Sequence, residues 1–226
     1  MDDVKWMRSL LSHNVRMPLS IIQGYGELLE EGKLDDEKQK EVVTKICGNI
    51  KYLSNILKLV IDNDSSLLEY KFEVVDILDV VKEVSQYMKD FTDRSGIKVN
   101  VISQSEKVII QADRWQFIRL FYNLFENSLK YMGRTGNINV MVSEAGKDSI
   151  LIVYKDDGKG MPEAEVDHVF ESGYRSAIHK GENGHGMGMY FVYQIVKDHG
   201  GNISVISDVG KGFSVRIILP VAQGDS

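Results

Sequence analysis

The stretch NLFENSLKY, residues 123–131, lies inside a long helical pattern and decides how the second half of the chain is interpreted. Asn123, Asn127 and Lys130 recur at positions i, i+4 and i+7, so they share one face of an otherwise apolar helix. Such a face can simply be solvated. An amide oxygen can also complete the coordination shell of magnesium, and a lysine can neutralise phosphate, so the face is a candidate binding site.

Two glycine-rich segments follow this helix. KDDGKGMP, residues 155–162, comes directly after a predicted strand, and the Asp156 carboxylate can accept a hydrogen bond from the exocyclic amine of a base. Gly158 and Gly160 allow close approach of a ligand, although the segment alone is more typical of a β-turn. GHGMGM, residues 184–189, opens a helix, where free N–H groups favour anions, although packing more often explains such a start. It is not a P-loop, because no GK[ST] follows.

The surrounding patterns predict an α/β sandwich with a mixed, mainly antiparallel sheet covered on one face by helices. Helices are predicted for residues 73–96, 113–132 and 184–201, and strands for 97–103, 138–144, 149–156, 203–207 and 213–220. NDSSLLEY, residues 63–70, has the composition of a junction. We therefore predict an α+β protein with two domains, residues 1–66 and 67–226.

The first 66 residues predict a helical hairpin. Between two apolar stripes, EEGKLDDEKQ supplies a glycine stop and acidic residues suited to a new helix start. The stripes are Leu11, Val15, Pro18, Ile22, Tyr25 and Leu29, then Val43, Ile46, Ile50, Leu53, Leu57 and Val60. A hairpin cannot bury so wide a face alone, so we expect a dimeric four-helix bundle; packing on the downstream domain is the alternative.

Composition narrows the classes of function. The 226 residues carry a formal net charge of −6, which argues weakly against a nucleic-acid partner. The single Cys47 excludes an internal disulfide framework or a cysteine-based zinc site and fits a reducing compartment. No run of 18 or more apolar residues occurs, and no secretory signal pattern opens the chain. The chain begins within an amphipathic pattern, so we expect a piece of a longer protein.

Six motifs, which follow one another along the chain in the order found in the family, resemble the catalytic core of sensor histidine kinases. The ATP-binding domain of that family is a branch of the Bergerat-fold ATPases. NLFENSLKY resembles the family's asparagine box, DDGKGMP the first glycine box and GHGMGM the second. VFESGYRS, residues 169–176, resembles the phenylalanine box, and GKGFS, residues 210–214, the last glycine-rich turn. SHNVRMPL, residues 12–19, resembles the phosphoacceptor box of the helical hairpin. The resemblance covers nearly the whole chain.

The resemblance implies roles for the nucleotide-binding residues. Asn127 would hold Mg²⁺, Asn123 would support the phosphate end of ATP, and Lys130 would approach the phosphates. Asp156 would read the adenine amino group. The other implied contacts are Tyr131 beside the nucleotide, Gly158 and Gly160 around its pocket, Gly184, Gly186 and Gly188 at the lid and helix start, and Tyr174 and Arg175 in the lid. Gly173 departs from the family, which often has an aromatic there, and this is expected to weaken docking of the lid against the hairpin.

The same resemblance makes His13 the phosphoacceptor, with Asn14 and Arg16 beside it in the catalytic box. Counted along the apolar seam, His13 faces solvent; a surface histidine without a role is the alternative. An imidazole, with an unperturbed pKa of about 6.5, is available as a nucleophile at neutral pH. Pro18 removes the N–H that would bond the carbonyl of Asn14, so a bend is predicted beside the histidine.

Two residues of the phosphoacceptor box depart from the family pattern. The family usually has Glu or Asp in place of Asn14, and that acid helps to take the imidazole proton. Loss of such help typically costs about 10²–10⁴ in rate, so we expect slow autophosphorylation unless another acid replaces it. Met17 stands where the family commonly has Thr or Asn to position a water molecule. A thioether does this poorly, so we expect weak phosphatase activity.

The predicted function is that of an ATP- and Mg²⁺-dependent protein-histidine kinase, a dimeric transferase of a two-component signal-transduction system. It would autophosphorylate His13 and pass the phosphoryl group to an aspartate of a response-regulator receiver. We expect a cytoplasmic location, with the membrane reached through an N-terminal sensor part of the inner-membrane protein. The alternative is a degenerate ATP-binding scaffold, which Asn14 and Met17 support. The histidine hairpin argues against a gyrase- or chaperone-type ATPase.

Overall fold

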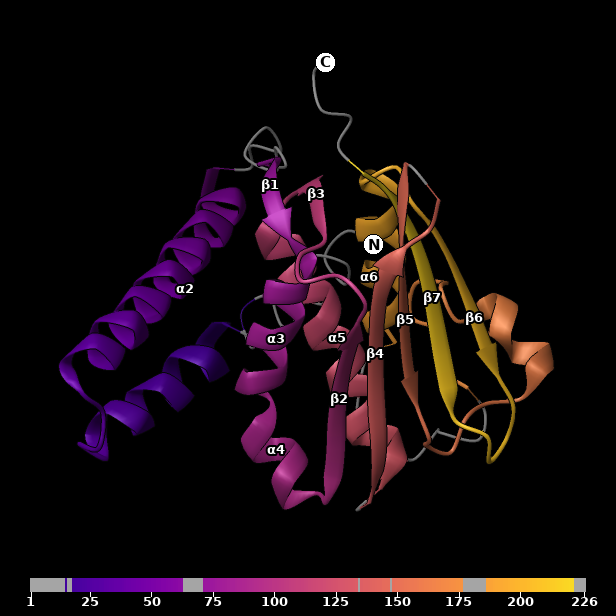
Figure 1. Cartoon of the computed structure of the whole chain (residues 1–226), viewed down its shortest axis with the longest axis horizontal. Helices are drawn as coiled ribbons and strands as arrows, with labels where there is room; N and C mark the ends of the chain where they lie inside the picture. The colour runs from indigo at the N-terminus through magenta and orange to yellow at the C-terminus, as the bar shows by residue number, and fades with distance from the viewer. Residues whose placement is uncertain are drawn as a thin grey trace. The chain divides into compact units, whose positions relative to one another are not determined.

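The computed structural model describes residue 15 and residues 18–62, 71–133, 135–146, 148–176 and 186–221, without the side chains of residues 51, 52, 54–62 and 90. The chain divides into two compact units, Met1–Tyr70 and Lys71–Ser226 (Figure 1). The predicted domain boundary between residues 66 and 67 lies outside the described residues. None of the helices in the described part of the chain is long and apolar enough to cross a bilayer.

The first unit contains a helix over residues 18–30 and the longer α2, Asp36–Asp62. The first helix ends where the N–H of Gly32 donates to the carbonyl of Leu29 at 3.1 Å. Helix α2 begins after Asp35, whose carboxylate accepts a hydrogen bond from the N–H of Lys38 at 2.9 Å, as an N-cap does. The two helices are joined by the predicted glycine stop and acidic start, so the predicted helical hairpin is confirmed.

Within the described part of this hairpin, only some of its apolar side chains are buried. Ile21 and Val42 are 6% and 8% exposed, and Asn49, seven residues after Val42, is 3% exposed. Val43 and Ile50, which belong to the predicted stripe, are 47% and 49% exposed in the single chain. The buried residues Val42 and Asn49 thus each precede an exposed residue of that stripe by one position, whereas Ile46 and Leu53 of the stripe are half-buried.

The second unit is built on a five-stranded sheet in the order β2-β4-β5-β7-β6 (Figure 1). Its strands are β2 Ile97–Ser103, β4 Gly136–Glu144, β5 Ser149–Asp156, β6 Asn202–Ser207 and β7 Phe213–Pro220. The β2–β4 pair is parallel and the other three pairs are antiparallel. Helices α3 (Ile77–Tyr87), α5 (Arg114–Met132) and α6 (Gly188–Asp198) cover one face of the sheet. The predicted mixed, mainly antiparallel sandwich is confirmed.

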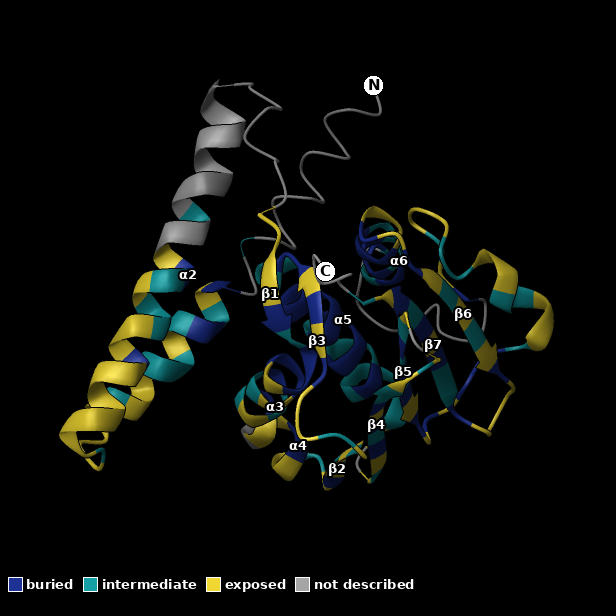
Figure 2. Cartoon of the chain, turned by 45° about the horizontal axis from the view of Figure 1, so that its top comes forward, coloured by how far each residue is buried: buried dark blue, intermediate teal, exposed yellow. Residues whose placement is uncertain are grey.

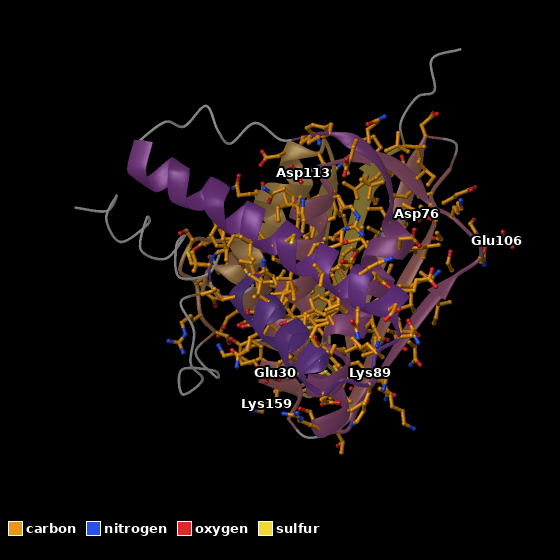
Figure 3. All side chains as sticks on the ribbon, turned by 90° about the vertical axis from the view of Figure 1, so that its left-hand side faces the viewer. Glu30, Asp76, Lys89, Glu106, Asp113 and Lys159 are labelled. Carbon is orange, nitrogen blue, oxygen red and sulfur yellow. The ribbon has the colours of Figure 1, made fainter. Side chains whose placement is uncertain are left out.

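The prediction of one helix over residues 73–96 is wrong. Glu73–Asp76 forms β1, which pairs with an unpredicted strand, β3, Ile109–Ala112, and the helix is interrupted at Met88 before α4, Lys89–Arg94. The cause lies in Asp76, which Figure 3 labels. Its carboxylate accepts hydrogen bonds from the N–H groups of Leu78 (3.0 Å) and Val108 (3.1 Å), so it caps α3 and ends the strand.

The core of the second unit lies between the helices and the inner face of the sheet (Figure 2). Alternate residues of β4 and β5 point inward, and Ile138, Val140 and Ile152 are fully buried. On α5, Phe121 and Phe125 are also 0% exposed. Each such side chain contributes about 1.5–3 kcal/mol by leaving water. This packing holds α5 in a defined rotation over β5, which sets the direction of its asparagine face.

Candidate functional site

The asparagine face of α5 packs against the first turn of α6. A Cβ built on Gly188 would lie 3.6 Å from the Oδ1 atoms of both Asn123 and Asn127. One turn back along α5, the guanidinium carbon of Arg119 lies 3.9 Å from the ring centroid of Phe191. The two helices therefore run antiparallel, and the absence of a side chain at residue 188 leaves space directly in front of the two amides.

Asn123 is buried without the hydrogen bonds that its amide needs. It is 1% exposed, and neither its Oδ1 nor its Nδ2 has a hydrogen-bond partner among the described residues. An unsatisfied buried polar group costs about 1–3 kcal/mol, so its presence in a well-packed core calls for an explanation. A ligand that reaches the space in front of Gly188 supplies one.

The first turn of α6 is suited to an anion. Its N-cap residue, Met187, makes no side-chain capping hydrogen bond within the described structure, and Gly188 brings the backbone close to α5. The N–H groups of a first helical turn carry partial positive charge and bind phosphate readily. The amides of Asn123 and Asn127 and the α6 N-terminus are therefore chemically suited to a phosphate-bearing ligand.

The same amides fit a magnesium ion that arrives with phosphate. In the part of the chain that the structure describes, no group of three or more His, Cys, Asp or Glu side chains is placed to hold a metal ion. Protein-bound Mg²⁺ is commonly held by one or two side-chain oxygens together with substrate phosphates and water. The Oδ1 atoms of Asn123 and Asn127 are oxygen ligands of this kind.

Asp156 ends β5 as a buried carboxylate, 5% exposed. Its Oδ1 accepts hydrogen bonds from the N–H groups of Gly158 (2.9 Å) and Phe213 (3.3 Å), and its Oδ2 accepts one from the Ser128 hydroxyl (2.6 Å). Burial raises the pKa of Asp156, and these hydrogen bonds oppose the rise. A carboxylate has about four acceptor positions, so one remains after these three bonds within the described structure. An exocyclic amine fits it.

The glycine-rich loop after Asp156 is held against the turn between β6 and β7. A Cβ on Gly160, whose φ is 62°, would lie 2.0 Å from the carbonyl oxygen of Asp208, so no other residue fits without movement. The Ser207 hydroxyl accepts from the N–H of Met161 (3.0 Å) and donates to the carbonyl of Gly212 (2.7 Å). The last glycine-rich turn therefore supports the first glycine box directly.

Lys130 and Tyr131 lie together at the end of α5. The Lys130 ammonium donates to the Tyr131 hydroxyl at 2.9 Å and lies 4.7 Å from the centroid of its ring. The Tyr131 carbonyl accepts from the N–H of Lys159, a residue of the glycine-rich loop that Figure 3 labels. These contacts attach the end of the asparagine helix to the loop that carries Gly158 and Gly160.

Tyr174 lies where the lid segment begins. Its hydroxyl donates to Glu165 in η2, Glu163–His168, at 2.8 Å, and its ring stacks on His168 with centroids 5.8 Å apart. Its pKa is raised to about 12 by burial and by the neighbouring carboxylates. The N–H of Gly173 donates to the carbonyl of Gly186 at 3.2 Å. The two ends of the lid thus meet, and the Tyr174 hydroxyl is engaged by η2.

Several predicted site residues are not part of this geometry. His13, Asn14, Arg16, Met17 and Gly184 lie outside the described residues. Arg175 is described and exposed, next to Tyr174 in the sequence. The structure brings together the two asparagines with Gly188, and Asp156 with Gly158.

Sequence reasoning missed Ser128 and Tyr154, although both bear on the site. The Tyr154 hydroxyl donates to Ser128 Oγ at 2.9 Å, and Ser128 donates in turn to Asp156. One signal was available: strand alternation puts Tyr154 and Asp156 on the same face of β5. Nothing in the sequence places Ser128 opposite them.

Two family models match the chain. Residues 9–62 match the His Kinase A (phospho-acceptor) domain, and residues 112–223 match the histidine kinase-, DNA gyrase B- and HSP90-like ATPase. The first match contains the SHNVRMPL box, and the second contains the asparagine and glycine boxes. The two matches follow the two-unit division of the chain.

Several known proteins of similar sequence and structure are histidine kinases. The sensor histidine kinase YvrG of Bacillus subtilis (strain 168) is 28% identical over 223 residues, which are 95% of this chain and 38% of YvrG. The structure of the mycobacterial sensor histidine kinase MprB is 26% identical with a TM-score of 0.58, covering 66% of this chain and 97% of that one. A structure of the histidine kinase ThkA in complex with the response regulator protein TrrA shares the fold, at 18% identity and a TM-score of 0.59, covering 97% of this chain and 62% of that one.

The chain spans only part of the curated relatives that it matches: 38% of YvrG, 33% of sporulation kinase A and 45% of the sensor histidine kinase YclK, all of Bacillus subtilis. The shared part comprises the two units described above. With both family models matched in order and with these relatives and solved structures, the chain belongs to the sensor histidine kinases, as their catalytic core.

Proposed function

We propose that this chain binds ATP between α5, β5 and α6 and uses it to phosphorylate His13. The observation that carries the proposal is the pair of Asn123 and Asn127 facing the space in front of Gly188, with the Asn123 amide buried and unsatisfied among the described residues. The match to the histidine kinase-type ATPase model supports ATP as the ligand. Asp156, at the other end of the site, would accept a hydrogen bond from the adenine amino group.

The proposed reaction is an in-line displacement. A ring nitrogen of His13 attacks the γ-phosphorus, an N–P bond forms, the bond to the bridging β,γ-oxygen breaks, and ADP leaves while the imidazole releases a proton to solvent or a base. Asn127 and Asn123 would hold Mg²⁺, which neutralises charge on the phosphates when it is bound. The residues of the chain orient the phosphates through the α6 N-terminus and the amides. Asn14 cannot take the proton, so we expect a slow step.

A response-regulator receiver would accept the phosphoryl group on an aspartate. The ThkA–TrrA complex, whose title names a histidine kinase and a response regulator protein, supports a partner of this class. Met17 offers no hydroxyl or amide to position a water molecule, so we expect phosphatase activity toward the receiver to be weak. A sensor part that reaches the membrane would precede this core in the whole protein.

We also propose a homodimer through the hairpin. Val43, Cys47 and Ile50 follow one another at spacings of four and three on α2 and are all exposed in the single chain, as is Leu19 on the first helix. Four helices from two copies would cover these apolar side chains. Light scattering on the Val43→Glu/Ile50→Glu variant should show a monomer, whereas Thr44→Glu, an exposed neighbour, should remain dimeric. A monomeric wild type would contradict the proposal.

The central experiment is incubation of the chain with γ-labelled ATP and Mg²⁺. Acid-labile label on the wild type, absent in His13→Gln, is the expected result. Asn14→Glu should label faster than the wild type, because it restores a base beside the imidazole. Label that survives His13→Gln would contradict the assignment of the phosphoacceptor.

The other outcomes identify the alternatives. No label on the wild type with label gained in Asn14→Glu would indicate a degenerate, scaffold-like kinase. Free phosphate released without bound label would indicate an ATPase instead.

A further inference from the structure

We propose that Tyr154 and Ser128 are positioning residues that orient Asp156 toward the 6-amino group of adenine, and so set the preference of the site for ATP over purine nucleotides without that group. The inference rests on the proposed function, because it assumes that Asp156 reads adenine. It assigns base selectivity to two residues that do not themselves touch the nucleotide.

The three residues form a directed chain of hydrogen bonds. The Tyr154 hydroxyl donates to Ser128 Oγ at 2.9 Å, and the Ser128 hydroxyl donates to Asp156 Oδ2 at 2.6 Å. Each donor therefore points toward the carboxylate. Hydrogen bonds that follow one another in the same direction polarise each other in a low-dielectric interior, which strengthens the last one.

The chain of bonds is held rigidly. Tyr154 and Ser128 are each 1% exposed, and Asp156 is 5% exposed. The ring of Tyr154 packs edge-on against Phe125, with centroids 5.5 Å apart and an interplanar angle of 86°. Phe125 lies three residues before Ser128 on α5, so the same face of the helix fixes the ring and receives its hydroxyl.

Ser128 departs from the usual behaviour of a serine inside a helix. Such a hydroxyl commonly bonds a carbonyl of its own helix, as Ser85 of α3 does with the Val81 carbonyl at 2.7 Å. Ser128 instead donates across to β5. The hydroxyl has one hydrogen to donate, and the arriving Tyr154 bond occupies an Oγ lone pair, so the remaining hydrogen is directed at Asp156.

This arrangement decides which way the carboxylate faces. Oδ1 is taken by the N–H groups of Gly158 and Phe213, and one position on Oδ2 is taken by Ser128. The acceptor position that remains on Oδ2 is the one available to an amine. Without the serine hydroxyl the carboxylate would be held on one oxygen only and could rotate about its end bond.

The electrostatics agree with this role. Burial raises the pKa of Asp156, and the Ser128 hydrogen bond is the first of the contacts that lower it again. The Ser128 bond thus favours the ionised carboxylate, which is the better acceptor. Removing this hydrogen bond should raise the pKa of Asp156. The affinity for ATP, which is lost at acid pH when Asp156 is protonated, should then be lost at a higher pH.

The test compares ATP with purine riboside triphosphate, which carries hydrogen in place of the 6-amino group. Calorimetry with Mg²⁺ on the whole chain would give the two dissociation constants for wild type, Ser128→Ala and Tyr154→Phe. We expect Ser128→Ala to weaken ATP binding by about 3- to 10-fold, the contribution of about one hydrogen bond, and to leave the analogue unchanged. Tyr154→Phe should act in the same direction with a smaller change. Ser85→Ala, the same deletion on α3, is the matched control and should change neither constant.

A merely structural role predicts a different pattern. The temperature of thermal unfolding would then be lower in both variants than in the wild type, while the ratio of the two dissociation constants would stay at the wild-type value. That result would overturn the inference. A wild-type ratio of the two dissociation constants in Ser128→Thr, which keeps a hydroxyl, would support the inference. So would a loss of ATP affinity at a higher pH in Ser128→Ala than in the wild type. A wild type that binds ATP without preference over the analogue overturns the inference and the assignment of Asp156 to the adenine amino group, but leaves ATP binding and phosphorylation of His13 standing. A wild type that does not bind ATP overturns the proposed function as well.

Discussion

The two ends of the α5–α6 pair carry buried polar groups that are treated in opposite ways. At one end, the Asn123 amide has no hydrogen-bond partner within the described structure, although it is 1% exposed. At the other end, Asp113 and His199 are also buried, and both make hydrogen bonds within the second unit. Burial alone does not explain the difference, because Asn123, Asp113 and His199 are all buried, so we attribute it to the task of each end.

Asp113, labelled in Figure 3, is the N-cap of α5. Its Oδ1 accepts from the N–H groups of Trp115 (3.0 Å) and Gln116 (3.2 Å), and its Oδ2 accepts from the N–H of Lys71 (3.0 Å). Lys71 is the first residue of the second unit. One carboxylate therefore both starts the helix and anchors the entering chain.

His199, just after α6, completes this end. Its Nε2 accepts from the N–H of Asp113 at 3.0 Å and its Nδ1 donates to the carbonyl of Ile195 at 2.7 Å, which requires the neutral ring with hydrogen on Nδ1. The ring contacts Phe72 and Phe117, each with centroids 4.9 Å away. Burial lowers the pKa of His199. Asp113 and His199, which make hydrogen bonds within the second unit, are part of the scaffold, whereas the open Asn123 amide faces the proposed ligand.

The sharpest way to break this contrast is Asn123→Leu. If the amide is kept for a ligand, the apolar substitution should weaken Mg²⁺–ATP binding by about 100-fold or more and leave the free energy of unfolding equal or higher, because an unsatisfied group is removed. Calorimetry and thermal unfolding of the same preparation measure both. Asn100→Leu, an exposed position on β2, should leave ATP binding unchanged. A large loss of stability in Asn123→Leu would make the amide a scaffold group.

Two glycine-to-alanine variants distinguish a glycine that the fold requires from a glycine that leaves room for a ligand. Gly160→Ala should lower the free energy of unfolding by about 2–4 kcal/mol, because its Cβ meets the carbonyl of Asp208 and its φ is positive. In Gly188→Ala the new methyl makes ordinary contacts at 3.6 Å, so stability should stay within about 0.5 kcal/mol. ATP binding should nevertheless weaken by about 10-fold, since the methyl fills the space before the amides. Equal effects of the two variants on stability would contradict this distinction.

His199→Gln tests the scaffold end. Losing the shape and the bonds of the ring should lower the free energy of unfolding by about 2 kcal/mol, while the ATP dissociation constant of the folded protein stays within about 2-fold. Denaturant titration monitored by circular dichroism provides the first value. His168→Gln, an exposed histidine on η2, is the control and should change stability by less than about 0.5 kcal/mol. A loss of ATP binding in His199→Gln without a loss of stability would instead assign His199 to the nucleotide site.

The smallest expected effect is on the pH dependence of stability. The pKa of His199 is lower in the folded protein than in the unfolded chain, so the unfolded chain binds more protons between the two values. Stability from this group is complete above the unfolded pKa, about 6.5, and is lost as pH falls toward the folded pKa. The free energy of unfolding, measured from about pH 7.5 down to about pH 5, should therefore decrease more steeply in the wild type than in His199→Gln. Parallel curves would exclude His199 as the titrating group.

Much of the fold could be predicted because it depends on local patterns. The alternation of Ile150, Ile152 and Tyr154 predicts a strand with one buried face, and the spacing of Asn123 and Asn127 predicts a shared helix face. Both predictions are confirmed. The prediction failed at Glu73–Asp76, where a helix-like apolar spacing hides a short strand. That strand exists because it pairs with β3, more than thirty positions later, and Asp76 caps the following helix.

The candidate site, too, could be predicted from the sequence only in its local patterns and not in its tertiary contacts. The order of the asparagine and glycine boxes, and the residue types in them, are properties of the sequence itself, and they sufficed to indicate a nucleotide-binding kinase core. The partners of those residues are not, since Ser128 reaches Asp156 across 28 positions and Asp113 reaches His199 across 86. Which buried polar atoms are satisfied depends on the rotation of α5 over β5 and on its packing against α6. Only the tertiary structure therefore decided that the Asp113 carboxylate is satisfied and that the Asn123 amide has no partner among the described residues, because hydrogen-bond satisfaction is a property of three-dimensional neighbours and not of spacing along the chain.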